Sequence, residues 1–540
     1  MALDTDVIVI GAGLAGLAAT AELADAGRRV ILLDQEPAAS LGGQAHWSPG
    51  GLFLVDSPEQ RRMRIRDSRA LARRDWLGAA GFDRPGDAWP RRWAEAYVDF
   101  AAGEQRAWLR AMGVRFGPLV GRAEHGGPST GGPGNSVPRC HVVRGAGPGL
   151  LDPFVRKVRA AAARGLVDLR FRHRVTGLAA SAGAVDTVTG EVLVPSGAAR
   201  GEASSREVAG RFELRARAVV LASGGIGGNH ALVRAAWPAR LGAPPGRMLS
   251  GVPAHVDGLM LGVAAGAGAE LVNGDRTWHC AEGVAELHPV WPGQGVRVLA
   301  GPSVLRLDAL GRRLPAPPFP GSDTPGALEL ARATGYDHGW LVLNRRIAER
   351  ELTLSGPERD PGSTGRPLRG LLRRALPGVP GPVRDHLAHG PDFVVAGNLH
   401  DLARAMNARA RVRLVGTAEL RRVVEERDRR LGGPRARRRL GDRLLRSAAP
   451  HRILDPDAAP LIAVRLSVLT RTSLGGLHTD LSARVLRPDG SVLDGLYAAG
   501  EAAGFGGGGL HGRRPLGGAF LGGCLFSGRT AGRAAAAATA

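Results

Sequence analysis

The feature that most constrains the fold of this sequence is a glycine-rich turn between two apolar segments near its N-terminus. The β-branched run Asp6–Ile10 leads directly into the glycine motif Gly11–Gly16, a helix-forming segment follows up to Gly27, and the apolar run Arg29–Leu33 comes next. Apolar runs of this kind are typical of strands that are buried in a parallel sheet. The order of strand, turn, helix and strand therefore predicts a βαβ unit.

The spacing inside the motif predicts a dinucleotide at this unit. Gly11 permits the tight turn, Gly13 lets the backbone approach a pyrophosphate at the helix N-terminus, and Gly16 allows helix and strand to pack closely. Asp34 closes the second strand, at the separation of about 20 residues where a carboxylate binds a ribose diol. Because Asp34 is an acid and not an arginine, a 2′-phosphate on that ribose is disfavoured.

Length and the distribution of apolar residues limit the fold further. The chain has 540 residues, more than the roughly 250–300 at which a single core stops growing, so we expect two cores or an inserted domain. No uninterrupted apolar run reaches the roughly 18 residues of a membrane span, and we expect none. The N-terminus carries neither the basic segment nor the cleavage site of a secretory signal, which favours a cytoplasmic protein.

The cysteines give no sign of a metal site. Cys140, Cys280 and Cys524 are far apart, and no C-x-x-C pair occurs. The sequence therefore carries no local motif for zinc, haem or an iron–sulfur cluster. We predict no metal ligands, and electrons from any redox reaction would have to leave to an acceptor outside the chain.

The net charge of +22 raises the alternative of a nucleic-acid-binding protein. Lysine occurs once, at Lys157, so the 72 basic residues are almost all arginines, and they are spread along the chain. The densest stretch, residues 404–446, has no aromatic side chain on which a base could stack. We therefore expect an arginine-rich solvated surface, and nucleic acid is disfavoured as a partner.

Later glycine-rich segments bear on which dinucleotide binds. The loop Leu41–Gly51 follows the ribose acid, where a nicotinamide-dependent dehydrogenase would usually enter its next strand and helix. The apolar strand Ala218–Gly227 also ends in glycines. Near the C-terminus, the strand Gly495–Glu501 ends in a carboxylate and is followed by the glycines of residues 504–509 and by an apolar helix from about Gly518. This arrangement departs from that of a nicotinamide-dependent enzyme.

With these segments the sequence resembles the flavoprotein family that includes fumarate reductase and succinate dehydrogenase flavoprotein subunits and the 3-ketosteroid Δ1-dehydrogenases. Within it, the sequence is most similar to the branch of FAD-binding, steroid-dehydrogenase-like oxidoreductases. The resemblance covers nearly the whole chain and implies FAD as the cofactor. The matching segments are Gly11–Gly16 with Asp34, Gly42–Gly51, Asn135–Pro138, Gly145–Gly149, Leu221–Gly228, Leu474–Asp480 and Gly495–Gly528.

The resemblance implies an α/β fold in which a Rossmann-like FAD-binding domain contains an inserted α+β capping domain. We expect the FAD-binding domain at residues 1–275 and 461–540, and the capping domain that binds substrate at residues 276–460. The early and late glycine motifs should then be neighbours in space. The expected cap includes a proline-rich segment, Arg313–Pro320.

The same resemblance implies which residues bind FAD. An acid at the place of Glu501 binds the ribitol chain in the family, and Val175 would approach the adenine through its backbone. The N-terminus of the helix near Gly518 would stabilise negative charge on reduced flavin. The expected cofactor-binding residues are Gly11, Gly13, Leu14, Ala15, Gly16, Asp34, Gln35, Gly42, Gly43, Gln44, Ser48, Gly50, Gly51, Val175, Ala222, Ser223, Gly224, Gly225, Gly500, Glu501, Gly517, Gly518, Ala519 and Leu521.

Family members transfer a hydride between a substrate C–C bond and flavin N5, so the resemblance implies an FAD-dependent dehydrogenase or reductase of a small molecule. Fumarate reductases hold the substrate carboxylate with an arginine at the place of Pro515, so fumarate and succinate are disfavoured here. Arg471 occupies a place where the family often has a histidine. It could polarise a substrate carbonyl as a fixed cation, or it could pair with a carboxylate such as Asp480.

Four further residues are candidates for catalysis. The steroid dehydrogenases use tyrosines, and Tyr336 is the best tyrosine candidate in this chain. His511 lies between glycines and could exchange a proton near neutral pH. Arg514 stands one residue before Pro515 and could compensate for the missing arginine, or it could be a structural or exposed arginine. Arg513 stands near a position where related sequences often have tyrosine.

Three hypotheses for function follow. The first is an FAD-dependent oxidoreductase that dehydrogenates or reduces a C–C bond next to the carbonyl of a steroid-like or other apolar ketone or enone, with an external electron acceptor of unknown identity. The second is a flavin-binding protein whose cap has lost its acid and base, which the departures at Arg513 and Pro515 motivate. The third is an arginine-rich nucleic-acid binder on a flavoprotein scaffold.

Overall fold

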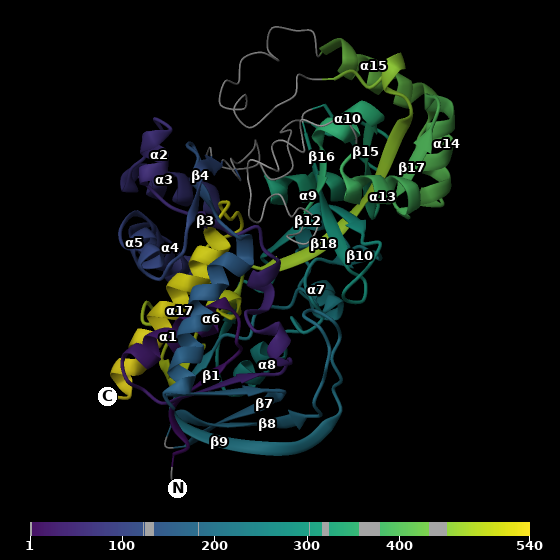
Figure 1. Cartoon of the computed structure of the whole chain (residues 1–540). Helices are drawn as coiled ribbons and strands as arrows, with labels where there is room; N and C mark the ends of the chain where they lie inside the picture. Colours follow the sequence, from purple (N-terminus) through teal and green to yellow (C-terminus); the bar gives the residue numbers. More distant parts are fainter. Residues whose placement is uncertain are drawn as a thin grey trace.

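The computed structural model describes residues 3–121, 124, 134–181, 183–301, 303–315, 323–355, 379–430 and 451–540. Two eight-stranded sheets dominate the chain and lie in two lobes (Figure 1). Residues 316–320 of the proline-rich segment and residues 431–446 of the arginine-rich stretch lie outside the described residues.

The first sheet contains the predicted βαβ unit. Strand β1 (Thr5–Ile10) pairs in parallel with β2 (Val30–Asp34) and with β9 (Val208–Leu221), and α1 (Leu14–Asp25) connects β1 to β2. The strand order is β20-β21-β9-β1-β2-β6, with β8 beside β9 and β7 beside β8. The other strands are β6 (Val167–Phe171), β7 (His173–Ser181), β8 (Ala184–Leu193), β20 (Arg484–Leu486) and β21 (Val492–Ala498).

Segments from both halves of the chain meet in this sheet. β21 lies parallel to β9, with Leu496 opposite Val219, and β9 separates it from β1. Three helices that lie side by side, α1, α6 (Ala146–Ala163) and α17 (Ala519–Ala538), cover one face (Figure 1). Helix α8 (Leu259–Gly266) and β7 and β8 pack on the other face. Because both faces are covered, the apolar run of β1 is buried, as a parallel strand requires.

The second sheet is built around β18 (Leu461–Ser473), which pairs with β10, β12, β15 and β17. A separate core, which includes Trp340, Met406 and Val424, packs between this sheet and its helices. The other strands of the sheet are β10 (Met248–Ser250), β12 (Thr277–Ala285), β13 (Gly295–Ala300), β14 (Leu305–Leu307), β15 (His338–Asn344), β16 (Leu352–Leu354) and β17 (Phe393–Ala396). The helices of this lobe are α9 (Thr324–Arg332), α10 (Arg345–Glu351), α13 (Gly381–His389), α14 (Leu399–Ala410) and α15 (Thr417–Arg430).

A small antiparallel sheet packs beside the first sheet. Its central strand β5 (Cys140–Val143) pairs with β3 (Gly51–Phe53) and β4 (Phe116–Gly121), and β3 contacts α17. The remaining elements are α2 (Pro58–Arg62), α3 (Arg69–Ala80), α4 (Ala88–Ala102), α5 (Gln105–Ala111), α7 (His230–Ala235), β11 (Leu271–Val272) and β19 (Gly476–Leu477).

The expected α/β fold class is confirmed. The division into domains stays a prediction: residue 461, where the FAD-binding domain was expected to resume, is the first residue of β18, and β18 pairs with the second sheet along its length. Over the part of the chain that the structure describes, no helix is both long enough and apolar enough to cross a membrane.

Candidate active site

A cavity of about 440 Å³ is lined by residues from both large sheets. The glycine turn after β1, the end of β2 and the loops after β9 and β21 form one wall, and β12, β13 and β18 form another. Because the carboxyl ends of parallel strands meet at one edge of a sheet, the first wall lies where ligands bind in α/β folds.

The glycine turn forms the part of the cavity that suits a dinucleotide. Asp34 accepts hydrogen bonds from the backbone N–H groups of Ala12 and Glu36, each at 2.8 Å, and so holds the turn against the end of β2. A Cβ atom on Gly13 would meet no atom within 4 Å, so open space remains on the cavity side of the turn. Helix α1 begins here without a side-chain cap, so its first N–H groups can receive a phosphate.

A buried carboxyl connects three distant segments of the chain. Glu501 accepts hydrogen bonds from Gln44 Nε2 at 2.9 Å and from the backbone N–H of Ser473 at 2.8 Å. Burial raises the pKa of Glu501 to about 7, although both hydrogen bonds and the positive charge of Arg471 oppose this rise. Glu501 and Gln44 line the cavity, so their remaining hydrogen-bonding capacity is available to a ligand.

The N-terminus of α17 also forms part of the cavity wall. Gly517, Gly518 and Leu521 line the cavity, and Gly518 precedes the helix with a φ of 86° and no side-chain cap. The carbonyl of Gly518 accepts a hydrogen bond from the N–H of Phe53 at 3.0 Å, which fixes the helix end against β3. The exposed first-turn N–H groups and the helix dipole favour a ligand with negative charge at this position.

The residues present fit FAD, with a glycine turn and helix N-terminus for its pyrophosphate and a second helix N-terminus for its reduced ring. Gly16, Gly42, Gly50, Gly225 and Ala519 do not line the cavity. Of the residues predicted to bind the cofactor, the following line it: Gly11, Gly13, Leu14, Ala15, Asp34, Gln35, Gly43, Gln44, Ser48, Gly51, Val175, Ala222, Ser223, Gly224, Gly500, Glu501, Gly517, Gly518 and Leu521.

Apart from Arg471 of β18, the second wall of the cavity consists of residues that were not among the predicted site residues. Trp278 on β12 contacts Phe520 of α17, with ring centroids 4.9 Å apart. The guanidinium of Arg297 on β13 lies 5.7 Å from the centroid of the Trp278 ring. Cys280 and Leu299 line the same wall. No local motif marks these residues, because the pairing of β12 and β13 with distant strands brings them to the cavity.

Arg471 is the predicted catalytic residue that lines the cavity. Its backbone N–H donates to His279 Nδ1 at 3.0 Å, but its guanidinium makes no hydrogen bond or ion pair within the described part of the chain. The predicted alternative, an ion pair with Asp480, does not form, because Asp480 pairs with Arg484 at 2.6 Å. Burial lowers the pKa of Arg471, yet an arginine in a protein keeps its proton. The cavity therefore contains a cation that is free to bind a substrate oxygen.

The two arginines before Pro515 are engaged in ion pairs outside the cavity lining. Arg513 Nε lies 3.4 Å from Asp83, and Arg514 Nη1 lies 3.0 Å from Asp323, which caps α9. These contacts tie the C-terminal glycine loop to its neighbours. The placement of Arg513 and Arg514 does not support the predicted contact with substrate.

Tyr336 and His511 also lie outside the cavity lining. Tyr336 is 37% exposed, in the turn between α9 and β15. His511 is fully buried, with its ring 4.9 Å from the ring centroids of both Phe505 and Phe520, which do line the cavity. Burial lowers the pKa of His511 to about 3. The imidazole is therefore neutral at pH 7, and neither placement supports the predicted proton exchange with a substrate.

Comparison with known sequences gives matches over nearly the whole chain. The FAD binding domain family matches residues 6–521. The chain is 56% identical over 546 residues to a KsdD-like steroid dehydrogenase of Mycobacterium tuberculosis, with 99% of this chain and 96% of the relative covered. A KsdD-like steroid dehydrogenase of Mycolicibacterium smegmatis is also 56% identical, with 99% of both chains covered.

Two of the solved structures with the same fold are 3-ketosteroid dehydrogenases. The 3-ketosteroid Δ1-dehydrogenase of Sterolibacterium denitrificans, in complex with 1,4-androstadiene-3,17-dione, matches with a TM-score of 0.70 at 18% identity over 99% of each chain. The 3-ketosteroid Δ4-(5α)-dehydrogenase of Rhodococcus jostii RHA1, in complex with 4-androstene-3,17-dione, matches with a TM-score of 0.65 at 21% identity, covering 99% of this chain and 98% of that one. At these identities the likeness concerns the fold.

Proposed function

This chain belongs to the FAD-binding domain family and is an FAD-dependent dehydrogenase or reductase that acts on CH–CH groups, and from that premise we propose that its substrate is an apolar cyclic ketone or enone of steroid-like size. The reaction would make or reduce the C–C double bond next to the carbonyl. When bound, FAD exchanges a hydride with one of the two substrate carbons. The protein must bind the substrate and stabilise the charge that develops on its oxygen.

The unpaired guanidinium of Arg471 is the observation that carries this proposal. Removal of a proton next to a carbonyl places negative charge on the carbonyl oxygen, and a fixed cation in a site that excludes water stabilises such charge strongly. The side chain of Arg471 can occupy this position because residue 251 is a glycine. A Cβ atom on Gly251 would lie 2.5 Å from Arg471 Cδ. We assign to Arg471 the binding of the substrate carbonyl.

The apolar side chains of the cavity lining support an apolar substrate. Trp278, Leu299, Phe505 and Phe520 line the cavity beside Arg471. Aromatic and aliphatic walls with a small number of polar groups are typical of sites for apolar ligands. The relatives named above are steroid dehydrogenases, which agrees with a substrate of this class.

A dicarboxylate substrate has less support. Pro515 stands where fumarate reductases carry a carboxylate-binding arginine, and Arg513 and Arg514 beside it are already paired with Asp83 and Asp323. A dicarboxylate would need a cation for each end. Arg471 provides one.

We also propose roles for the residues toward FAD. Asp34 would bind the adenosine ribose, Gln44 and Glu501 would bind the ribitol chain, and the N–H groups at the start of α17 would face the negative charge of the reduced ring. The acceptor of the electrons would be a small molecule or protein outside this chain, and the enzyme would work in the cytoplasm.

The test is anaerobic reduction of the flavin by candidate substrates. The purified protein should be yellow, and mixing with a saturated 3-ketosteroid should bleach its flavin absorbance, whereas the reduced enzyme should be reoxidised by 4-androstene-3,17-dione or 1,4-androstadiene-3,17-dione. A yellow protein that responds to dithionite but to no ketone or enone would favour the second hypothesis, a flavin-binding protein with a non-catalytic cap. A protein that retains no FAD after reconstitution would contradict both.

A further inference from the structure

A buried carboxyl that the sequence analysis did not single out lies on the substrate side of the cavity. Glu124 is 6% exposed and lines the cavity together with Arg471 and Cys280. Its Oε1 accepts a hydrogen bond from the hydroxyl of Thr324 at 2.7 Å, and its Oε2 accepts one from the backbone N–H of Thr324 at 3.1 Å. A single residue at the start of α9 therefore fixes both carboxyl oxygens.

The hydroxyl of Thr324 connects Glu124 to a charged network. Arg297 Nη2 donates to Thr324 Oγ1 at 3.1 Å, and Arg297 Nε donates to Glu282 Oε2 at 3.1 Å. Arg306 Nη2 donates to the other oxygen of Glu282 at 2.7 Å. Arg297 has Glu282 as its direct ionic partner, and its hydrogen bond toward Glu124 passes through the threonine hydroxyl, while its positive charge also acts on Glu124.

The charges around Glu124 oppose each other. Burial raises the pKa of Glu124, and the negative charge of Asp323 at the start of α9 adds to this rise. The positive charge of Arg297 on β13 and the two hydrogen bonds from Thr324 act in the opposite direction, and the net shift is upward. Cys280 on β12 also faces this carboxyl, and its own thiol has a raised pKa because it is buried. A carboxyl whose pKa is raised toward neutrality is suited to both accept and release a proton.

We propose that Glu124 is the residue that exchanges a proton with the substrate carbon next to the carbonyl, a role that rests on the proposed function. In dehydrogenation, the C–H bond at that carbon breaks, the proton forms an O–H bond with a Glu124 oxygen, and the electron pair moves into the enolate whose oxygen Arg471 binds. In reduction, the Glu124 O–H bond breaks and the proton returns to the carbon. Thr324 is the positioning residue, since it holds both oxygens of Glu124.

The position of Glu124 relative to the cofactor wall supports this assignment. A continuous series of contacts leads from Phe520 in the first turn of α17 to Trp278, then to Arg297, and through Thr324 to Glu124. Arg514 strengthens the far end of this series, because it pairs with Asp323, the cap of α9. The carboxyl and the flavin side of the cavity are therefore held by one packed unit.

The test separates proton exchange from the redox step. The oxidised holoenzyme is mixed in deuterated buffer with a panel of ketones that includes 4-androstene-3,17-dione and a saturated 3-ketosteroid, and deuterium uptake at the carbons next to the 3-keto group is followed by mass spectrometry. Binding is measured in parallel from the change in flavin absorbance. We expect Glu124→Gln to bind with unchanged affinity and to lose exchange by about 100-fold or more.

Two further variants and the pH profile test the role of the carboxyl. Thr324→Val removes the hydroxyl and should slow exchange, whereas Thr324→Ser keeps it and should restore most of the rate. The wild-type dehydrogenation rate should rise with pH as Glu124 loses its proton, and this limb should be absent in Glu124→Gln. Exposed Glu207→Gln is the matched control and should behave as wild type.

The outcomes distinguish this assignment from the proposed function. If Glu124→Gln binds ketones and exchanges deuterium at the wild-type rate, Glu124 is not the proton-transfer residue, while the proposed function stands. If the wild-type enzyme binds no member of the panel and exchanges no deuterium, the proposed function is wrong, and the role of Glu124 is wrong with it.

Discussion

Arg471 shows how a charge can be kept available inside a protein. A cation held away from bulk water without a partner is costly, and the described arginines of the second wall differ in this respect: Arg297 pairs with Glu282, whereas the half-buried Arg471 faces the cavity without an ionic partner. Such an arrangement is expected where the charge is needed by a ligand. The unpaired charge lowers the stability of the folded protein, and a substrate oxygen that binds Arg471 offsets this loss of stability.

We therefore predict that Arg471→Met lowers kcat/KM for a ketone substrate by about 10²–10³-fold, the cost of removing one donor to a developing oxyanion. Arg471→Lys should retain part of the activity, because it keeps the charge but loses the planar donor pair. For both variants, kcat/KM is determined from the rate of anaerobic flavin reduction at increasing ketone concentration. The FAD content of the purified variants serves as the control and should match wild type; a fully active Arg471→Met enzyme would contradict the assignment.

Glu501 gives a prediction on stability and pH. Its pKa in the folded apoprotein is about 7, above the reference value of 4.5 that it has when unfolded. The folded state therefore binds the proton more tightly, so the contribution of Glu501 to stability is complete below about pH 4.5 and is lost as pH rises to about 7. Two and a half pKa units correspond to about 3 kcal/mol.

The measurement is urea unfolding of the apoprotein across this pH range for wild type and for Glu501→Gln. The difference in unfolding free energy between the two proteins isolates Glu501 from all other titrating groups. We expect the wild type to lose stability relative to the variant as pH rises. Parallel pH profiles would show that the carboxyl is not buried in the way the structure describes.

At the scale of elements, the sequence predicts most where the signal is local. The glycine motif and its flanking apolar runs predict β1, α1 and β2, because a βαβ unit is a contiguous segment. Helix α1 begins at Leu14, inside the glycine motif, directly after its N-cap residue Gly13. The late glycine segment likewise predicts α17.

The substrate wall could not be predicted in this way. Trp278 and Arg297 reach the cavity because β12 pairs with β13 and with β18, whose residues lie far away in the chain. Glu124 meets Thr324 only through tertiary packing. Tyr336 and His511 were predicted from residue type and from the family resemblance. Neither criterion takes account of burial and packing, which keep both residues out of the cavity lining. Arg471 was accessible to sequence reasoning because it stands beside a recognisable glycine turn.

The start of α17 is the element on which a second structural test can be made. Gly518 has a φ of 86°, and a Cβ atom there would lie 2.8 Å from the backbone of Leu52 and Phe53. Gly518→Ala should therefore displace the helix end from β3 and weaken FAD binding. Gly27 is a matched control, because it has a φ of 73° but open space around its Cβ position.

We expect Gly27→Ala to cost about 1 kcal/mol of stability from backbone strain alone and to leave FAD affinity unchanged. Gly518→Ala should cost more and should also raise the dissociation constant for FAD. Urea unfolding and fluorescence titration with FAD measure the two quantities. Equal effects of the two substitutions on FAD affinity would contradict the role of the α17 N-terminus.

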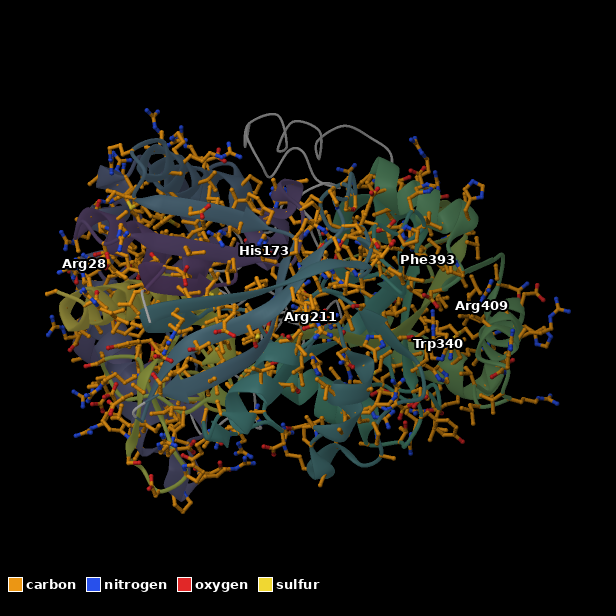
Figure 2. The ribbon with its side chains drawn as sticks, turned by 90° about the horizontal axis from the view of Figure 1, so that it is seen from below. Arg28, His173, Arg211, Trp340, Phe393 and Arg409 are labelled. Carbon is orange, nitrogen blue, oxygen red and sulfur yellow. The ribbon has the colours of Figure 1, made fainter. Side chains whose placement is uncertain are left out.

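At the scale of the whole molecule, the net charge of +22 is distributed and not concentrated. Figure 2 shows Arg28 and Arg409 at opposite ends of the protein and Arg211 between them. Many arginines are also paired, as Arg139 is with Asp67 and Asp75. A nucleic-acid site would need a continuous basic surface, so the arrangement of the described residues favours an enzyme with an arginine-rich exterior.

The cofactor cavity unites segments from the whole length of the chain, and this leads to a prediction about stability. The turn after β1, the loops after β9 and β21 and strand β18 of the second sheet all line it, so a ligand that fills the cavity binds the folded arrangement and not the unfolded chain. FAD at a concentration of 100 times its dissociation constant should raise the free energy of unfolding by about 2.7 kcal/mol. Chemical unfolding with and without FAD measures this increase.

Asp34→Ala tests whether the increase arises at the dinucleotide site. Asp34 supports the glycine turn through Ala12 and Glu36, so its loss should weaken FAD binding. A tenfold loss of affinity should reduce the increase at this fixed FAD concentration from about 2.7 to about 1.4 kcal/mol. Asp168→Ala removes an exposed carboxylate from the neighbouring strand β6 and should leave the increase unchanged. Because each variant is compared with itself without FAD, direct effects of the substitution on stability cancel. An undiminished increase in Asp34→Ala would mean that FAD stabilises the protein through contacts other than those at the end of β2.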